Sequence, residues 1–333
     1  MKRVLITGGA GYVGSVLVPH LLGKGYAATV YDILWYGDDH LPKGHPGLRI
    51  VDGDIRDTAK LAAEFPGIDV VLHLACISND PSFELDENLS ESINYTCFEP
   101  MVIAAKKAGV KRFVYCSSSS VYGVSDQPEV TEEHPLLPVS LYNKYKGLCE
   151  PVLFKHQGPG FTCVTIRPAT VCGYGPRTRL DLSVNILTNL AVNKGKITVF
   201  GGKQLRPNLH IRDMVDAYQL MIEAPAEKIA GEIFNIGYQN LSISNIAEIV
   251  RDVVRQEFPD RAEIMIETTE SNDPRSYHIN SDKIKRVLGY VPKRTIEDAV
   301  RDLCQAFKAG KLPDSLTDDR YFNVRTMKAV KAA

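Results

Sequence analysis

The sequence lacks a surplus of charge of either sign. Its 333 residues include 39 Lys and Arg and 40 Asp and Glu, which gives a formal net charge of −1 at pH 7. A balanced charge provides no basic surface for nucleic acid and no acidic, disordered character, and the 44% apolar content is ordinary for a globular chain. We therefore expect a protein that acts on small molecules and has no nucleic-acid partner.

Long apolar runs are also missing. No stretch approaches the roughly 20 apolar residues that a membrane-spanning helix needs. The first residues, Met1 to Thr7, run into a predicted strand rather than into a cleavable signal. We expect a cytoplasmic protein with no membrane partner.

Cysteine is sparse and scattered. The seven cysteines include no Cys-x-x-Cys pair, and their odd number does not suit a disulfide framework. We therefore predict no metal site and mostly buried thiols. Cys116 and Cys172 lie near the candidate site described below, but neither has an adjacent His or Lys to stabilise a thiolate. A catalytic thiol is not expected.

Apolar runs alternate with segments of helical periodicity through the first half of the chain. The predicted strands cover residues 3–6, 28–31, 49–52, 70–74, 112–116 and 163–167. The predicted helices cover residues 13–23, 58–64, 89–108 and 141–154. This alternation indicates an α/β fold with a parallel sheet wrapped by helices.

Beyond Pro168 the alternation loosens, and Gly and Pro punctuate shorter elements. We expect residues 1–168 to form a first domain, to which the chain returns near residues 205–240. Residues 169–333 should form mainly a second, smaller mixed α/β lobe that binds the substrate. The elements predicted in this part are strands at residues 233–236 and 263–267 and helices at 244–258, 281–288 and 296–308.

A glycine-rich loop follows the first predicted strand. Gly8, Gly11 and Gly14 are spaced three apart and lead into a helix, so that backbone amides and a helix N-terminus face an open cleft. Gly8 permits the turn, Gly11 lets a phosphate approach the backbone, and Gly14 lets the helix lie close to the strand. Together with Tyr12 and Val13 they are candidate contacts of a pyrophosphate. This order of elements predicts a Rossmann-type doubly wound sheet that binds a dinucleotide.

Asp32 ends the second predicted strand, 18 residues after Gly14. A carboxylate in this place accepts both hydroxyls of the adenosine ribose and repels a 2′-phosphate. Residues 33–38 supply no Arg or Lys that could hold such a phosphate, so NAD is favoured over NADP. Further candidate cofactor contacts, at the ends of the third and fourth predicted strands, are Asp54, Ile55, Leu74 and Ala75.

Tyr142 and Lys146 stand four residues apart on a predicted helix and therefore share one face. Ser118 ends a neighbouring predicted strand. An ammonium favours the phenolate of a nearby tyrosine, and a phenolate can remove the proton of a substrate alcohol. In a chain with 15 tyrosines this spacing also arises by chance, so its meaning depends on the context.

With these motifs in order, the chain resembles the extended short-chain dehydrogenase/reductase family, and within it the NAD-dependent nucleotide-sugar epimerase/dehydratase group, including UDP-glucose/galactose 4-epimerases. The resemblance covers about residues 2–300. It implies that Tyr142 is the catalytic base, that Lys146 holds the nicotinamide ribose and lowers the pKa of Tyr142, and that Ser118 hydrogen-bonds the reacting hydroxyl. Besides the glycine loop and Asp32, it rests on Gly53-Asp-Ile55, His73-Leu-Ala75, Asn94 (a further cofactor contact), Ser117–Gly123, Tyr142/Lys146, Arg167-Pro168, Val199–Arg206 and Asp273-Pro-Arg275.

The same alignment discriminates among reactions. Dehydratases of this group carry an Asp-Glu pair just after the catalytic residue, where this chain has Ser119 and Ser120. Without a carboxylic acid and a second base, an elimination has no general acid–base pair. The resemblance therefore implies an epimerase that inverts C4 through a transient 4-keto sugar. A nucleotide-sugar dehydrogenase or ketoreductase with net redox and a non-catalytic dinucleotide sensor remain alternatives.

The resemblance implies a nucleotide-diphosphate sugar as the substrate. Arg clamps phosphate bidentately, and Arg206 and Arg275 match the diphosphate-binding arginines of the family. Asn185 lies where related enzymes begin a helix that touches the diphosphate, and Thr170 replaces an Asn of many UDP-galactose 4-epimerases. The remaining candidate substrate contacts are Ser78, Ser118 and Ser119. Arg177 and Arg179 form a second basic cluster, whose direction the sequence leaves open.

The resemblance also suggests an assembly. Helices 89–108 and 141–154 are the pair that resembling enzymes pack into a four-helix bundle between two subunits. We therefore expect a homodimer formed through these helices. The nucleotide and the sugar remain open, because residues 77–82 differ from the loop that the 4-epimerases place against the sugar.

Overall fold

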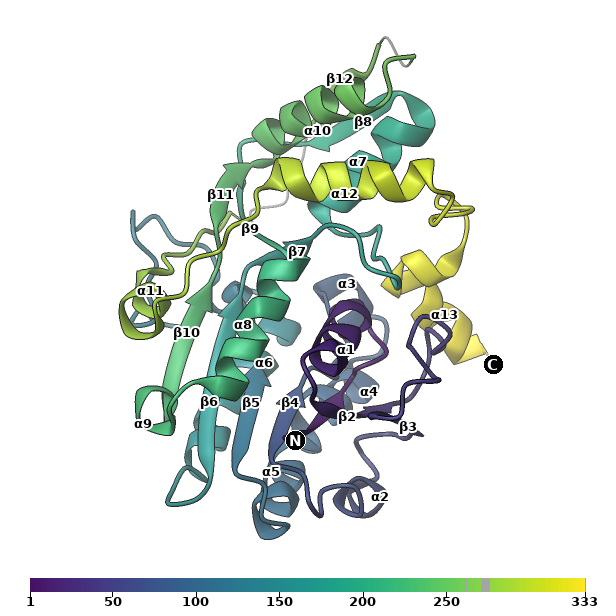
Figure 1. Cartoon of the computed structure of the whole chain (residues 1–333). Coiled ribbons are helices and arrows are strands. Elements are labelled where there is room, and N and C mark those ends of the chain that lie inside the picture. The colour runs from purple at the N-terminus through teal and green to yellow at the C-terminus, as the bar shows by residue number, and fades with distance from the viewer. Residues whose placement is uncertain (261–262, 271–275, 333) are drawn as a thin grey trace.

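Seven parallel strands form the larger sheet, in the order β10-β6-β5-β4-β1-β2-β3 (Figure 1). The computed structural model describes residues 1–260, 263–270 and 276–332. The strands are β1 (Arg3–Thr7), β2 (Ala27–Asp32), β3 (Leu48–Asp52), β4 (Val70–His73), β5 (Arg112–Cys116), β6 (Thr162–Pro168) and β10 (Glu232–Ile236). The predicted doubly wound parallel sheet is confirmed, and β10 adds an edge strand from late in the chain beside β6.

Helices cover both faces of this sheet, and the strands explain why. Val4 and Ile6 belong to one buried apolar cluster and Leu5 to another, since successive side chains of a strand point to opposite faces. The helices around the sheet are α1 (Gly14–Gly23), α2 (Thr58–Ala62), α3 (Asp80–Phe83), α4 (Glu87–Glu91), α5 (Phe98–Lys107), α6 (Leu141–Phe154), α8 (Ile211–Glu223) and α9 (Ala226–Ile229). None of the helices in the described ranges is long and apolar enough to cross a membrane.

The single helix predicted over residues 89–108 is wrong in its continuity. The chain forms α4, then a π-helical turn at Ser92–Thr96, and then α5, which begins at Phe98. Pro100 lies in the first turn of α5, where its missing N–H costs no hydrogen bond. Deeper in a continuous helix, its ring would collide with the carbonyl of Thr96. Periodicity alone did not register this break.

The second lobe lies beyond the carboxyl ends of the large sheet (Figure 1). It has its own apolar core, formed by the faces of its helices. Its strands are β7 (Thr170–Cys172), β8 (Lys196–Phe200), β9 (Leu205–His210), β11 (Gln239–Ser242) and β12 (Met265–Thr269). Its helices are α7 (Ser183–Lys194), α10 (Ile243–Glu257) and α12 (Ile296–Lys308). Helix α11 (Asp282–Leu288) packs beside β10 at the edge of the large sheet (Figure 1). The strand predicted at residues 263–267 begins two residues later, at Met265, and pairs with β8.

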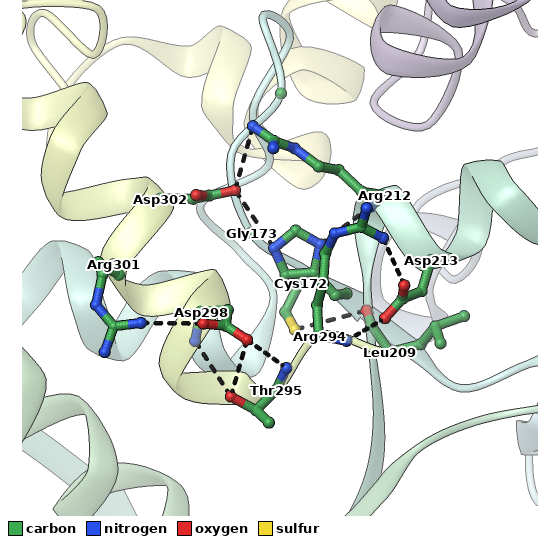
Figure 2. Close-up of polar contacts among 12 residues, drawn as sticks. Cys172, Gly173, Leu209, Arg212, Asp213, Arg294, Thr295, Asp298, Arg301 and Asp302 are labelled. Carbon is green, nitrogen blue, oxygen red and sulfur yellow. Dashed lines mark hydrogen bonds and ion pairs between the residues drawn. The ribbon is translucent and has the colours of Figure 1, made fainter. Parts of the chain in front are cut away.

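Ion pairs join the second lobe to α8 (Figure 2). Arg294, just before α12, places Nη1 2.6 Å from Oδ1 of the buried Asp213. Asp302 on α12 lies 3.4 Å from Nε2 of His210 and 3.6 Å from Nη2 of Arg212. Because His210 and Arg212 stand at the start of α8, these contacts set how the two parts of the molecule face each other.

A buried ion pair joins α6 to β6 and supports the site described below. Nη2 of Arg167 lies 2.5 Å from Oε2 of Glu150, and both side chains are almost fully buried. The hydroxyl of Ser117 donates a hydrogen bond of 2.6 Å to Oε1 of Glu150. Nη1 of Arg167 donates one of 2.7 Å to the hydroxyl of Tyr122.

We expect Glu150→Ala to lower the free energy of unfolding by about 3–5 kcal/mol, because it leaves the charge of Arg167 buried without its carboxylate. Urea denaturation of the full chain measures this loss. Asp252→Ala, which breaks the exposed pair with Arg251, is the control and should cost little. Equal midpoints for the two variants would contradict the role given to the buried pair.

Candidate active site

A cavity of about 540 Å³ runs along the carboxyl ends of the strands in the large sheet. It crosses the point between β1 and β4 where the strand order reverses, which is where open α/β sheets bind ligands. The order of the strands fixes the order of the residues that follow them. Residues after β3 and β2 therefore line one end, the glycine loop after β1 the middle, and residues after β5 and β6 the other end.

Most of the predicted cofactor residues line this cavity. They are Gly8, Gly11, Tyr12, Val13, Asp32, Asp54, Ile55, Leu74, Ala75, Tyr142 and Lys146. They come from the ends of four strands and from one helix, and the sheet brings them together.

The glycine loop has the shape that a pyrophosphate site needs. Gly8 has a positive φ of 73°, and a Cβ there would come within 2.6 Å of the amide nitrogen of Ala75. A Cβ on Gly14 would overlap the backbone of Gly9. At Gly11 a Cβ would meet only the carbonyl oxygen of Gly8, so the space above the loop is open. Since α1 begins at Gly14, its N-terminus faces this space and favours an anion.

Asp32 is fixed by the backbone at the end of β2. Its Oδ2 accepts a hydrogen bond of 2.9 Å from the amide of Ala10, and its Oδ1 accepts one of 2.9 Å from the amide of Leu34. Burial raises the pKa of this carboxyl, and the two amides act in the opposite direction. The arrangement leaves a carboxylate on the cavity wall at the place predicted for the adenosine ribose.

Arg177 reaches this end of the cavity from the second lobe. Its guanidinium lies over the ring of Tyr36, 3.6 Å from the ring centre. The sequence had left the direction of Arg177 open and offered no cation near Asp32 among residues 33–38. Because 145 positions separate Arg177 from Asp32, only the fold could reveal their proximity.

Asn94 and Asn185 were also predicted to touch a ligand, but they do not belong to the lining of the cavity and bond to the backbone of its loops. Asn94 exchanges hydrogen bonds of 2.8 and 2.9 Å with the backbone of Ile77. Asn185 accepts one of 2.9 Å from the amide of Gly173 and donates one of 2.8 Å to the carbonyl of Arg179. Both amides are buried and serve to position the loops of the cavity wall.

The predicted catalytic residues come together in the cavity from two elements. Tyr142 and Lys146 lie on α6, and Ser118 follows β5. Nζ of Lys146 donates a hydrogen bond of 2.7 Å to the carbonyl of Cys116. The hydroxyls of Ser118 and Ser120 lie 2.7 Å apart. These contacts fix the lysine and the serine beside the tyrosine.

The electrostatics of the pair combine burial with mutual attraction. Burial raises the pKa of Tyr142 above its ordinary value, and the ammonium of Lys146 acts in the opposite direction without cancelling this effect. Burial lowers the pKa of Lys146, but Cys76 and Tyr142 raise it, and the net value lies above that of an ordinary lysine. Lys146 therefore stays charged at neutral pH and favours the phenolate. Burial raises the pKa of Cys116, which disfavours a thiolate there.

The predicted substrate residues Ser78, Ser119, Thr170 and Arg206 also line the cavity. The guanidinium of Arg206 lies over the ring of Tyr277, 5.1 Å from its centre. Nε of Arg179 lies 2.9 Å from Oδ1 of Asp181, and Nη1 of Arg179 donates a hydrogen bond to Ser78. Arg275 lies outside the described residues. No group of three metal-ligating side chains occurs within the ranges that the structure describes.

Residues 4–237 match the profile of the NAD dependent epimerase/dehydratase family. The chain belongs to this family. It is 29% identical over 325 residues to the UDP-glucose 4-epimerase of Lactobacillus helveticus, a match that covers 90% of this chain and 94% of the relative. It is 30% identical over 310 residues to the dTDP-glucose 4,6-dehydratase of Streptomyces griseus, covering 90% and 92%.

A solved structure extends the likeness to three dimensions. DesIV, the dTDP-glucose 4,6-dehydratase of Streptomyces venezuelae, was determined with NAD bound. It superposes with a TM-score of 0.80 at 27% identity, covering 93% of this chain and 98% of DesIV. The family member described here is thus an NAD-dependent enzyme of the nucleotide-sugar epimerase/dehydratase group. Its glycine loop suits the pyrophosphate of NAD, and Asp32 suits the hydroxyls of the adenosine ribose.

Proposed function

We propose that this enzyme epimerises C4 of a nucleotide-diphosphate sugar through a transient 4-keto sugar. The observation that carries the proposal is the composition of the catalytic end of the cavity. Ser118, Tyr142 and Lys146 are there, and Ser119 and Ser120 provide hydroxyls where an elimination needs carboxylic acids.

Each residue of the set has one task. NAD, when bound, supplies the acceptor and donor of the hydride at C4. The phenolate of Tyr142 takes the proton of the 4-hydroxyl, and Ser118 donates a hydrogen bond to the same oxygen. Lys146 keeps the phenolate stable. After the keto sugar has rotated in the cavity, the hydride returns to the other face of C4. Tyr142 then returns the proton to the oxygen on C4, which gives the epimer.

Because the chain is similar to dehydratases as well as to epimerases, Ser119 and Ser120 are the residues that favour epimerisation over dehydration. Ser120 donates a hydrogen bond of 2.5 Å to Oδ1 of Asn143 and lies 2.7 Å from Ser118, so its hydroxyl belongs to the catalytic network. Ser119 is buried. A hydroxyl at either place has a pKa far too high to protonate a leaving group at neutral pH. Oxidation and return of the hydride need no such acid.

The part of the cavity wall that carries Arg206 and Tyr277 suits a nucleoside diphosphate. Arg206 offers a cation that can hold phosphate, and Tyr277 beside it offers an aromatic face. The named relatives act on UDP-glucose or dTDP-glucose, which supports a uridine or thymidine nucleotide. Ser78 and Thr170 lie on the same cavity and are candidate contacts of the sugar.

The test is turnover without added cofactor. The protein as purified is incubated with the glucose and galactose derivatives of UDP, dTDP, GDP and CDP, and the products are followed by proton NMR. We expect the C4 epimer of at least one sugar to form without added NAD, because the cofactor regenerates in each cycle. A 4-keto-6-deoxy sugar would show a dehydratase, and a reaction that requires stoichiometric cofactor would show net redox. Either of these two results would overturn the proposal.

A further inference from the structure

The C-terminal segment, residues 312–332, returns from the second lobe to the large domain. The segment forms a short 3-10 turn at Asp319–Tyr321 and then α13 (Asn323–Ala332). In Figure 1 this yellow segment descends from α12 to the side of the large sheet. Helix α13 packs against α3, which follows β4.

The first half of the segment is fixed to the second lobe. Asn189 on α7 donates a hydrogen bond of 3.0 Å to the carbonyl of Ser315, and the hydroxyl of Ser315 donates one of 2.8 Å back to Asn189. The amide of Leu180 donates one of 2.9 Å to the carbonyl of Tyr321. These bonds bring the start of α13 to the cavity.

Asn323, the first residue of α13, bonds to both sides of the cavity. Its Nδ2 donates a hydrogen bond of 2.9 Å to Ser78, in the loop after β4. Its Oδ1 accepts one of 2.7 Å from Nη2 of Arg177, and its amide donates one of 3.1 Å to Asp181, both in the second lobe. The side chain is only 5% exposed and lines the cavity.

Met327 lies one helical turn after Asn323 and also contributes to the cavity wall. It is 3% exposed and belongs to the apolar cluster that contains Ile55 and Ile77. Ile55 follows β3 and is one of the predicted cofactor contacts. Met327 also lines the cavity, so α13 forms part of the wall on the adenosine side.

Arg177 shows what this wall faces. It is 6% exposed, it lies on Tyr36, and it is close enough to Asp32 for their charges to interact. Its Nε has no hydrogen-bond partner among the residues that the structure describes. Buried donors are normally bonded, so an unused donor of a buried cation on a cavity wall indicates an oxygen-bearing ligand. NAD held by the glycine loop and Asp32 would provide such oxygens.

We propose that residues 312–332 are a strap that completes the NAD site and slows release of the cofactor. Asn323 is its positioning residue, because it holds Arg177 toward the cofactor and ties the second lobe to Ser78. NAD can leave only after these bonds open. The inference rests on the proposed function, in which NAD stays bound from one cycle to the next.

The test is the dissociation rate of NADH from the full-length protein. NADH is bound, an excess of NAD is added in a stopped-flow instrument, and the loss of protein-bound fluorescence is recorded. Asn323→Ala should release NADH about tenfold faster or more, since it removes a hydrogen bond to a charged group and one to a hydroxyl. Lys328→Ala, on the exposed side of the same helix, is the matched control and should release NADH at the rate of the unaltered protein. Equal rates for Asn323→Ala and Lys328→Ala would overturn the strap.

Hydrogen exchange of the unaltered protein gives a second reading that does not depend on a variant. The amides of α13 should exchange more slowly when NAD is bound, and unchanged exchange would overturn the proposal. Neither measurement uses a sugar. A protein with the expected NADH release that epimerises no nucleotide sugar would refute the proposed function and leave the strap standing. Epimerase activity with unchanged NADH release in Asn323→Ala would refute the strap alone.

Discussion

Tyr142→Phe should lower kcat by about 10²–10⁴-fold, the usual contribution of a general base. The variant removes one oxygen atom, which is the atom that accepts the proton of the sugar hydroxyl. Binding of NADH should change little, because the ring and the glycine loop remain. The measurement is the initial rate of epimer formation at saturating sugar nucleotide, together with a fluorescence titration of NADH.

Tyr145→Phe is the matched control for this change. It removes the same atom from the same helix, but Tyr145 packs against Phe83 and Tyr95 and does not line the cavity. Its kcat should stay within a few-fold of the unaltered enzyme. If Tyr142→Phe turned over as fast as Tyr145→Phe, Tyr142 would not be the base.

Lys146→Met should move the pH dependence of kcat to higher pH. The ammonium of Lys146 lowers the pKa of Tyr142, so its removal leaves burial as the main influence and raises that pKa. An opposite charge at close range shifts a pKa by about 1–3 units, and the acidic limb of the profile should shift upward by at least about one unit. Because the base must be a phenolate, activity near neutral pH falls and recovers in part as the pH rises.

The profile is measured at saturating substrate and cofactor, so that weaker binding of the nicotinamide ribose does not obscure the shift. Lys144→Met removes an equal charge from the exposed side of α6 and should leave the profile in place. A loss of activity in Lys146→Met that is uniform across the pH range would mean that the lysine only binds the cofactor.

Local sequence patterns were sufficient for the elements that create the NAD site and the base. The predicted helix over residues 141–154 coincides with α6, and the strand at 112–116 coincides with β5. These segments have strong periodicity or β-branched and aromatic residues, and their ends carry local signals. The hydroxyl of Ser140, for example, accepts a hydrogen bond from the amide of Asn143 and starts α6.

The contacts that the sequence missed join residues far apart in the chain. Arg177 meets Asp32 and Asn323 only because the second lobe folds back over the strand ends. Asn94 and Asn185 occupy positions that suggested ligand contacts, yet each finds a backbone partner that only the folded loops supply. Short-range patterns cannot show such partners, because they arise from packing. The homodimer through residues 89–108 and 141–154 stays a prediction.

The fate of the hydrogen on C4 tests the proposed epimerisation most directly. A nucleotide sugar that the enzyme accepts is prepared with deuterium at C4 and incubated with the purified protein in ordinary water, without added cofactor. Mass spectrometry and NMR then locate the label. We predict that the epimer keeps its deuterium at C4, because the hydride leaves and returns within one active site while Tyr142 exchanges only the hydroxyl proton. The proposed epimerisation would be contradicted if the epimer lost its deuterium to solvent. It would also be contradicted if the labelled sugar were never inverted at C4.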